Sequence, residues 1–427
     1  MNTKHFFLLL STATLVSSSL FPIAHHPAQA ISSLQSLSPT GATQVENASS
    51  ELSSPASPLL ARSTPSIVRR GDSGEQAGLV SEIATTYSGI HSRHLRVITA
   101  IRTNNNRLKL ISWEIGSESI TRTGDSGNQA GQATQIDISG SGTSGPDGKL
   151  VTAVRTASGT LKLISWQRDQ AGNITRLGDS GNQAGDISLV QIEEIRPDVY
   201  VTAVRTGNGR LKLITWRLNS DGSLTRLSDS GNSAGSVSEI ALVVKREPVG
   251  VDGEENLVTT AVRDAQENLK LVTWKIAENG DITRLADSGN QAGKAQMIQI
   301  INAGPYMVTA VRTASGQLKL ISWDRGLNRV DDSGNQSSGN NPTGEISLME
   351  HPHNDSIVSA VRTNNGQLKL ISWNIRPDGQ LIRSGDSGNE AGTASLIAIE
   401  GSAVVNAPIV TAVRTQENRL KLIAWDD

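Results

Sequence analysis

Short apolar segments recur along the chain in a fixed order, separated by polar turns. One complete unit contains an alternating segment at 135–138, Val-Thr-Ala-Val-Arg-Thr at 151–156, Leu-Lys-Leu-Ile-Ser-Trp at 161–166 and Ile-Thr-Arg at 174–176. These segments are rich in Val, Ile, Thr and Leu, and Gly, Asn and Asp bound them, as is typical of strands and tight turns. Each unit therefore predicts a meander of four β-strands.

The third segment of the unit ends in tryptophan every time, and the whole pattern occurs seven times. The tryptophans lie 49 to 58 residues apart, close to the repeat length of roughly 40–50 residues that is typical of β-propeller blades. They are Trp113, Trp166, Trp216, Trp274, Trp323, Trp373 and Trp425. We predict that these side chains pack between blades, although stacking on a sugar is an alternative role for an indole ring.

The second and third segments are apolar at both alternating sets of positions, so both faces of each sheet must be covered. Packing seven sheets radially would cover them, whereas an open solenoid would need polar end caps that the sequence lacks. Ile67-Val68-Arg69 matches the fourth segment and would complete the last blade in a 3+1 closure, but a 2+2 closure is also compatible. The predicted fold is all-β: a seven-bladed β-propeller of four-stranded antiparallel blades over residues 66–427, closed by its N- and C-terminal strands.

The repeated unit resembles those of seven-bladed propellers, and a tryptophan ending the third strand is similar to the WD-repeat arrangement. The chain departs from WD repeats in lacking their Gly-His and Trp-Asp pairs, except at Trp323-Asp324 and Trp425-Asp426. The near-identical units also resemble those of secreted propeller lectins. That resemblance implies glycan binding, but no lectin motif matches residue by residue.

The first 65 residues differ from the repeats. Lys4, the apolar run that begins at Phe6 and the Ala28-Gln29-Ala30 site are typical of a signal peptide over residues 1–30, with an uncleaved membrane anchor as the alternative. Residues 31–65 are rich in Ser, Pro and Ala and predict a flexible linker. We therefore expect a secreted, periplasmic or cell-surface protein with no membrane span after signal cleavage.

Composition narrows the chemistry. The chain has no cysteine, which excludes disulfides and thiolate nucleophiles. A formal net charge of −2 gives no overall basic field, so we expect no nucleic-acid partner. His91 and His94, and likewise His351 and His353, are spaced like metal ligands but have no evident third ligand, so we expect neither a metal nor a cofactor.

The repeats place the same polar side chains at one end of every blade. Successive turns of a meander alternate between its two ends, so the Asp-Ser-Gly loop after the fourth strand and the tight hairpin after the second strand share a face. The repeated aspartates are Asp72, Asp125, Asp179, Asp229, Asp287, Asp332 and Asp386. The asparagines that follow in six of these loops are Asn128, Asn182, Asn232, Asn290, Asn335 and Asn389. The arginines near the end of the second strand are Arg102, Arg155, Arg205, Arg263, Arg312, Arg362 and Arg414.

Two interpretations of this repeated face are open. In the structural one, each second-strand arginine pairs with a loop aspartate and locks adjacent blades. In the functional one, the Asp, Asn and Arg side chains bind a polyhydroxylated ligand, and seven weak sites gain strength through multivalency. A second arginine in every fourth strand adds basic charge to the framework, which favours an acidic ligand.

The sequence thus favours a non-enzymatic, lectin-like module that binds a glycan or another extracellular polymer, with a protein as a further candidate partner. A hydrolase, a lyase or a periplasmic assembly scaffold is the alternative, because irregular loops could build a single site. The two differ in symmetry. A lectin would spread its function over the repeats, whereas an enzyme would concentrate it in residues that break them.

Overall fold

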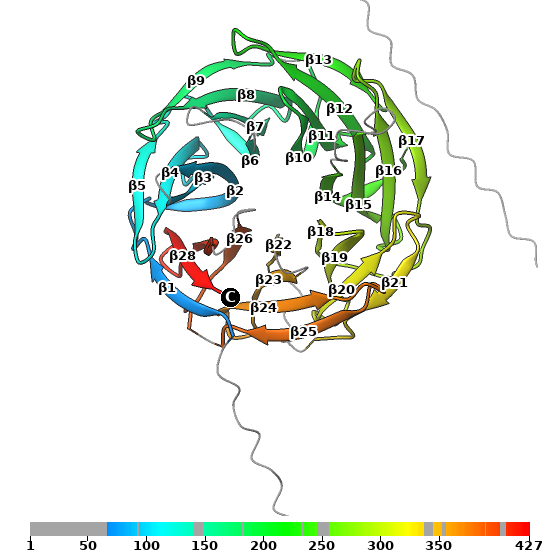
Figure 1. Ribbon diagram of the computed structural model, residues 1–427. Coiled ribbons are helices and arrows are strands. Elements are labelled where there is room, and N and C mark those ends of the chain that lie inside the picture. Colours follow the sequence, from blue (N-terminus) through cyan, green and yellow to red (C-terminus); the bar gives the residue numbers. More distant parts are fainter. Residues whose placement is uncertain are drawn as a thin grey trace, which may run out of the picture. The chain divides into compact units, whose positions relative to one another are not determined.

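The computed structural model describes residues 66–427 apart from 92–93, 141–147, 182, 232–233, 246–255, 337–344, 352–355, 389 and 402–406. The predicted signal peptide and linker, residues 1–65, lie outside the described residues. Within the described part, strands form seven four-stranded antiparallel sheets arranged as blades around a central axis (Figure 1). The prediction of a seven-bladed propeller is confirmed.

Every blade has the same radial order of strands. The innermost strands are β2 (Val80–His91), β6 (Ala133–Gly140), β10 (Ile187–Arg196), β14 (Val237–Lys245), β18 (Ile298–Ala303), β22 (Ile346–His351) and β26 (Leu396–Glu400). The second strands are β3 (His94–Thr103), β7 (Lys149–Thr156), β11 (Val199–Thr206), β15 (Asn256–Asp264), β19 (Tyr306–Arg312), β23 (Ser356–Arg362) and β27 (Ile409–Arg414). The third strands are β4 (Leu108–Ile115), β8 (Leu161–Arg168), β12 (Leu211–Leu218), β16 (Leu269–Ile276), β20 (Leu318–Trp323), β24 (Leu368–Ile375) and β28 (Leu420–Asp426). The outermost strands are β5 (Ile120–Asp125), β9 (Ile174–Asp179), β13 (Leu224–Asp229), β17 (Ile282–Asp287), β21 (Arg329–Asp332), β25 (Leu381–Asp386) and β1 (Val68–Asp72).

The ring closes by the 3+1 arrangement. Strand β1 pairs antiparallel with β28, with Val68 opposite Asp426 and Arg69 opposite Trp425, so the N-terminal strand is the outermost strand of blade 7. Blades 1 to 6 each use four consecutive strands, beginning with β2. Figure 1 shows β1 beside β28, at the point where the two ends of the repeat array meet. The 2+2 alternative was therefore wrong.

The apolar core lies between blades. One buried cluster joins Val151 and Leu163 of blade 2 to Val190 and Trp216 of blade 3, and another joins blade 1 to blade 7 across the closure. Third strands are buried along most of their length, as expected for sheets covered on both faces. Because each blade buries its surface only against its neighbours, closure of the ring covers every sheet.

All seven tryptophans are completely buried, at 0% exposure, so the prediction that they are core residues is confirmed. Each indole Nε1 donates a hydrogen bond of 2.9 to 3.2 Å to a hydroxyl on the second strand of the same blade. The acceptors are Thr99, Thr152, Thr202, Thr260, Thr309, Ser359 and Thr411. A buried indole N–H left without an acceptor would be costly, which explains the repeated hydroxyl.

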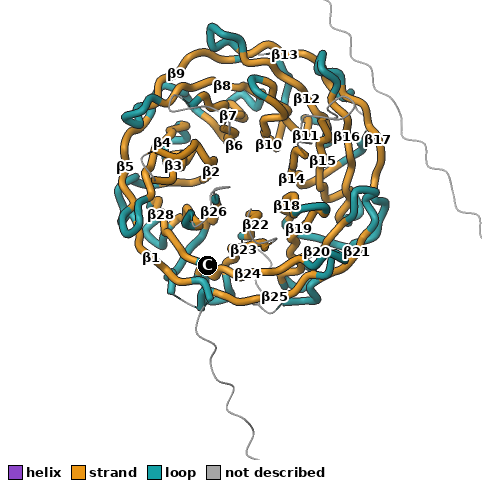
Figure 2. The backbone as a smooth tube through the Cα atoms, in the orientation of Figure 1, coloured by secondary structure: helices purple, strands orange, loops and turns teal. Residues whose placement is uncertain are grey.

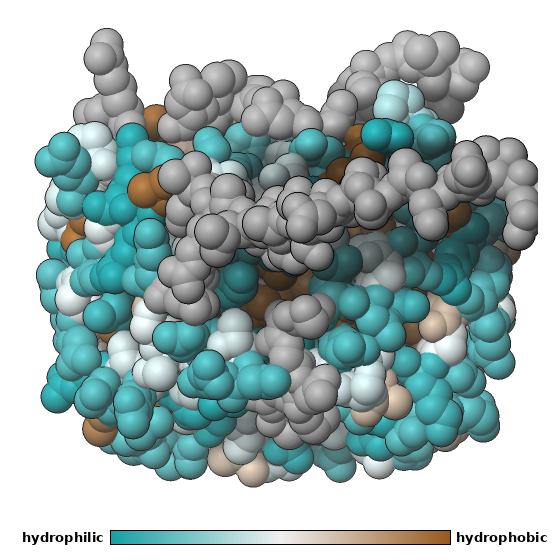
Figure 3. All heavy atoms as spheres, turned by 90° about the horizontal axis from the view of Figure 1, so that it is seen from below, coloured by the Kyte–Doolittle hydropathy of each residue, from teal (hydrophilic) through white to brown (hydrophobic). Residues whose placement is uncertain are grey.

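Loops join the strands of every blade around the ring (Figure 2). The tight hairpins need positive φ where the sequence has glycine, as at Gly209 with φ 81°. The side view in Figure 3 shows an outer wall that is mostly hydrophilic, and the exposed Leu177, Leu285 and Val330 lie on three outermost strands. In the part of the chain that the structure describes, no helix is both long and apolar enough to cross a membrane.

Candidate functional site

The repeated aspartates are held within their own blades. In every blade, one oxygen (Oδ2) accepts a hydrogen bond from the outer-strand arginine three residues earlier, and the third-strand lysine lies 3.1 to 3.8 Å from the carboxylate. Oδ1 accepts the N–H of the loop glycine at 2.7 to 2.9 Å, which forms an Asx turn. Partial burial acts to raise the pKa of Asp125, but the Gly127 N–H, Lys109 and Arg122 outweigh it and the pKa is lowered.

The partner predicted for these aspartates was wrong. The outer-strand arginine, and not the second-strand arginine, forms the ion pair, and it also fastens its blade to the preceding one. Arg176 Nη1 donates to the Gln129 carbonyl at 3.0 Å, and Arg226 does the same to Gln183 at 2.9 Å. In the same way, Arg69 donates to the Glu390 carbonyl, Arg122 to the Gln76 carbonyl and Arg329 to the Gln291 carbonyl. The Asp-Ser-Gly loop is therefore part of a lock between blades.

The loop asparagines separate into two groups. Asn128, Asn290 and Asn335 are exposed and form no side-chain hydrogen bond with other described residues. Asn182, Asn232 and Asn389 lie outside the described residues. The three described amides remain accessible on the face formed by the Asp-Ser-Gly loops and the hairpins between second and third strands, which we call the hairpin face.

The second-strand arginines lie on this face one strand nearer the axis than the lysines that contact the aspartates, and their contacts differ between blades. Arg155 and Arg205 each donate from Nε, at 2.6 Å, to a carbonyl of the next blade's innermost strand, Ile187 O and Val237 O. Arg102 contacts Glu82, and Arg263 contacts Glu267. Arg312 donates to the Gly316 and Arg362 carbonyls, and Arg414 donates to the Ser395 hydroxyl. The structure thus does not bring the aspartates and these arginines together into seven equal sites.

Arg362 and Arg414 line a pocket of about 340 Å³ that opens between blades 6 and 7 on the hairpin face. Arg362 Nε is buried and has no hydrogen-bond partner among the described residues, whereas Arg414 Nε donates to Ser395 at 2.7 Å. Besides the two arginines, the pocket is lined by Asn365, Gly366, Thr393, Ala394, Ser395, Thr415, Gln416 and Asn418. The lining thus presents amides, hydroxyls and two guanidinium groups.

The charged residues in the lining of this pocket are both arginines. Glu345 precedes β22, and burial raises the pKa of its carboxyl, while the nearby Arg362, Arg414 and Arg312 act to lower it. One carboxylate therefore faces three guanidinium groups. An anionic or strongly polar ligand would find a favourable potential here.

Sequence reasoning missed a set of carboxyl groups on the innermost strands. Glu82 Oε1 accepts the Ile136 N–H at 2.9 Å, and Asp137 Oδ2 accepts the Ile192 N–H at 2.8 Å. Each carboxyl thus satisfies an N–H on the free edge of the next blade's innermost strand. Burial raises the pKa of Glu82, and it raises that of Asp137 to about 7. An acidic residue inside an otherwise apolar first segment was the available signal.

The histidine pairs are not assembled into a metal site in the described part of the chain. His94 lies 4.0 Å from Glu114, and His353 is outside the described residues. Among the described residues, no three His, Cys, Asp or Glu side chains gather as metal ligands would.

Comparison with known proteins places the chain by its fold. No protein-family model and no curated protein matches the sequence. A chain of the mitotic checkpoint complex is 12% identical with a TM-score of 0.50, covering 90% of this chain and 99% of that one. Sqt1 of Saccharomyces cerevisiae is 11% identical with a TM-score of 0.49, covering 84% of this chain and 99% of that one. The fucose-specific lectin of Aleuria aurantia is 12% identical with a TM-score of 0.47, covering 82% of this chain and 96% of that one. At such identities the similarity is one of fold alone, that of a β-propeller.

Proposed function

We propose that the protein is a non-enzymatic, lectin-like binding module whose hairpin face binds a polyhydroxylated and acidic ligand. The pocket between blades 6 and 7 carries this proposal, because it combines two guanidinium groups with three amides and three hydroxyls. Its volume of about 340 Å³ falls within the roughly 300–1,000 Å³ that is typical of small-molecule sites. Amides and hydroxyls match the donors and acceptors of a sugar, and a guanidinium binds a carboxylate or sulfate through two parallel hydrogen bonds.

The contacts of the arginines favour one strong site over seven equal ones. At the junctions of Arg155 and Arg205, the guanidinium is occupied by a backbone carbonyl of the next blade. At the junction of blades 6 and 7, Arg362 has a buried Nε without a partner among the described residues. Arg263 Nε shares this feature, but the Arg263 guanidinium is paired through Nη2 with Glu267. A ligand oxygen would satisfy that donor, which otherwise costs free energy. The exposed asparagines of the other loops could add weaker contacts with a polymer.

The lining residues support binding over catalysis. None of the ten residues around the pocket carries a carboxyl, imidazole or thiol group. Glycoside cleavage commonly needs a pair of carboxyl groups that flank the scissile bond. We also propose that the module acts outside the cytoplasm, as the signal-like segment at residues 1–30 suggests.

Binding to acidic and neutral oligosaccharides tests the proposal. Arg362→Gln and Arg414→Gln should each weaken binding of an acidic oligosaccharide about tenfold or more, since a charged hydrogen bond contributes about 1.5–3 kcal/mol. Arg210→Gln is the matched control, because Arg210 is exposed on the equivalent hairpin of blade 3 and its side chain makes no hydrogen bond with described residues. Isothermal titration should give about one strong site per chain. Seven equal sites, or equal losses in all three variants, would contradict the proposal.

A further inference from the structure

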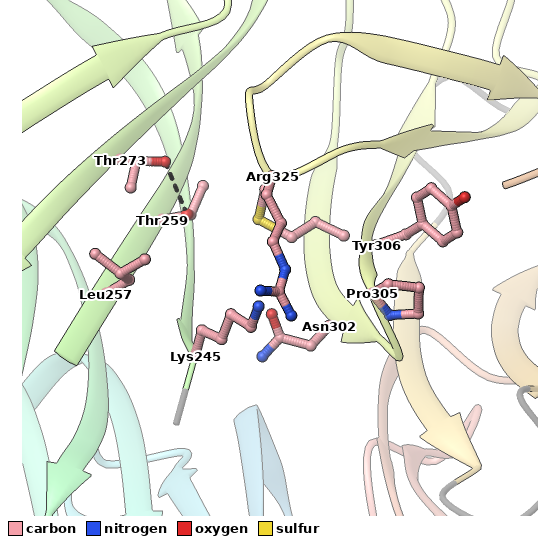
Figure 4. Close-up of a pocket in the computed structure, with 9 residues that line it drawn as sticks. Lys245, Leu257, Thr259, Thr273, Asn302, Pro305, Tyr306 and Arg325 are labelled. Carbon is pink, nitrogen blue, oxygen red and sulfur yellow. Dashed lines mark hydrogen bonds between the residues drawn. The ribbon is translucent and has the colours of Figure 1, made fainter. Parts of the chain in front are cut away.

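A second pocket lies between blades 4 and 5, at the opposite end of the blades from the hairpin face. Its volume is about 90 Å³, roughly three times the volume that a water molecule occupies in the liquid. Figure 4 shows Thr259 and Thr273 bonded to each other on one side of the pocket, and Pro305 and Tyr306 on the other side. The space between these two sides is that of one small chemical group.

At three other junctions, a hydrogen bond between blades occupies the same position. The hydroxyl of the residue before the tryptophan donates to a glycine carbonyl of the next blade, at 2.5 to 2.7 Å. The glycine lies in the loop between the third and fourth strands of that blade. The pairs are Ser165 with Gly222, Thr215 with Gly280, and Ser322 with Gly379.

Blade 5 lacks this acceptor because its loop is short. Trp323 and Arg329 are six residues apart, whereas the equivalent tryptophan and arginine are ten apart in blades 2, 3, 4 and 6. Thr273, directly before the tryptophan of blade 4, therefore receives no glycine carbonyl from the described residues of blade 5. Its hydroxyl is instead bonded to that of Thr259, at 3.1 Å.

Thr259 departs from the repeat at the same place. It lies opposite Thr273 on the neighbouring strand, where the other six blades have an aliphatic side chain. These aliphatic residues are Ile98, Val151, Val201, Val308, Val358 and Val410. Two hydroxyls therefore line the pocket where the repeat would place an aliphatic wall.

This pair of hydroxyls has one hydrogen-bond donor to spare. Two hydroxyls carry two protons, and the bond between them uses only one. Neither Thr259 nor Thr273 has a further side-chain partner among the described residues. Both side chains are buried, at 5% and 9% exposure, so a donor without an acceptor costs free energy here. An acceptor from a ligand in the pocket would remove that cost.

The rest of the lining supplies apolar surface and an amide. Leu257 and Met307 are half-buried and expose apolar side chains to the pocket. Asn302 is anchored, because its Nδ2 donates to the Val244 carbonyl at 2.9 Å. Its Oδ1 accepts no hydrogen bond from another described residue. The lining thus offers a donor, an acceptor and an apolar wall.

Two cationic side chains also line the pocket but are not available to a ligand. Figure 4 shows the polar ends of Lys245 and Arg325 near that of Asn302. Both cations already interact with other groups of the chain. The site is therefore suited to a neutral group, which needs no charged partner.

We propose that this pocket binds a terminal N-acetyl group, carried either by an amino sugar or by an acetylated amino acid. The acetamide carbonyl would accept the spare proton of the Thr259 and Thr273 pair, in place of the glycine carbonyl used at other junctions. The methyl group would lie against Leu257 and Met307, and the N–H would donate to Asn302 Oδ1. An acetamide carries the same carbonyl and N–H as the peptide units that the short loop omits.

Titration of the chain with the methyl glycoside of N-acetylglucosamine tests the site, with methyl glucoside as the matched ligand that lacks the acetamide. The acetylated sugar should bind at millimolar concentration with one site per chain, and the glucoside at least about tenfold more weakly, since it lacks the carbonyl and the methyl group. N-acetylglycinamide distinguishes the source: tighter binding than the sugar indicates an acetylated amino acid, and weaker binding indicates an amino sugar. No detectable binding of either acetylated ligand, or equal binding of the glucoside, would overturn the proposal.

Variants then locate the site. Thr259→Val combined with Thr273→Val gives blade 4 two aliphatic side chains and should weaken binding of the acetylated ligand about three- to tenfold, the effect of one neutral hydrogen bond. Thr215→Val is the matched control, because it creates the same pair with Val201 in blade 3, where the hydroxyl is bonded to Gly280, and it should leave binding unchanged. Equal losses in the two proteins would refute the location.

An exchange of loops tests the role of the short loop directly. Replacing residues 324–328 with residues 374–382, the longer loop of blade 6, should bring a glycine carbonyl to Thr273 and abolish binding of the acetylated ligand. Unchanged thermal midpoints show that these variants fold. All of them should retain binding of the acidic oligosaccharide at the hairpin face, so this proposal and the function proposed above can fail separately. Unchanged binding of the acetylated ligand after the loop exchange would contradict the proposal.

Discussion

The bond between each tryptophan and its hydroxyl partner can be tested by a double-mutant cycle in blade 3. Trp216 is fully buried, and its Nε1 donates to Thr202 Oγ1 at 3.0 Å. Thr202→Val removes the acceptor and leaves a buried N–H without a partner, which should lower the free energy of unfolding by about 1–3 kcal/mol. Trp216→Phe removes the N–H and part of the ring, and Trp216→Ala should cost about 3–5 kcal/mol through the cavity that it leaves.

The informative quantity is the effect of Thr202→Val in the Trp216→Phe background. Because Trp216→Phe has already removed the N–H, Thr202→Val then leaves no buried donor without an acceptor. In this background it should lower the free energy of unfolding by less than about 0.5 kcal/mol, since replacing both partners of a buried hydrogen bond with apolar groups is nearly neutral. Urea denaturation followed by circular dichroism gives all four free energies, with the same dependence on urea concentration in each variant. If Thr202→Val costs the same in both backgrounds, the hydroxyl does not act through the indole.

Three further predictions concern closure, pH and blade contacts. Deleting residues 66–72 removes β1 and exposes the edge of β28, so the calorimetric thermal midpoint should fall sharply, whereas deletion of residues 31–65 should leave it unchanged. Burial raises the pKa of Asp137 from 3.8 to about 7, so the stability that this group contributes is full below pH 4 and is lost as the pH rises through 7. The thermal midpoint of the wild-type protein should therefore be higher at pH 5 than at pH 8. Asp137→Asn should reduce that difference. Gly222→Ala would place a Cβ 2.5 Å from Leu177 Cβ at a φ of 85°, and it should lower the free energy of unfolding by about 2–4 kcal/mol in urea denaturation. Gly231→Ala, at a φ of 62° with no atom within 4 Å of the new Cβ, should lower it by about 1 kcal/mol. Equal losses would show that the Leu177 side chain moves to make room.

The fold could be predicted from the sequence because every level of the pattern agrees. Apolar positions on both faces of the third strand required neighbours on both sides, and the match of Ile67-Val68-Arg69 to the fourth segment indicated a shared blade. The choice between 3+1 and 2+2 closure could not be made, because both cover the same apolar surface. The pairing of β1 with β28 distinguishes them.

The candidate site was harder to predict because it depends on radial position. Three basic residues accompany each aspartate in the repeat, and the sequence does not state which one reaches it. The lysine and the outer-strand arginine lie on the two outermost strands beside the loop, whereas the second-strand arginine lies nearer the axis and contacts other groups. The spacing of three residues between Arg122 and Asp125 was a visible clue that such pairs form locally. Pockets between blades depend on loop lengths in two neighbouring units, which a single repeat does not reveal.

The position of β1 imposes an order on biosynthesis. Ser73, directly after β1, accepts a hydrogen bond on Oγ from the Leu422 N–H, 349 residues later in the chain. At translation rates of about 5–20 residues per second, the first strand emerges roughly 17–70 s before its partner. During that interval β1 has no strand to pair with, and blade 1 lacks blade 7, which covers one of its faces in the closed ring. The native ring therefore cannot close before the last strand has been synthesised, so the propeller is completed only after translation of its final strand.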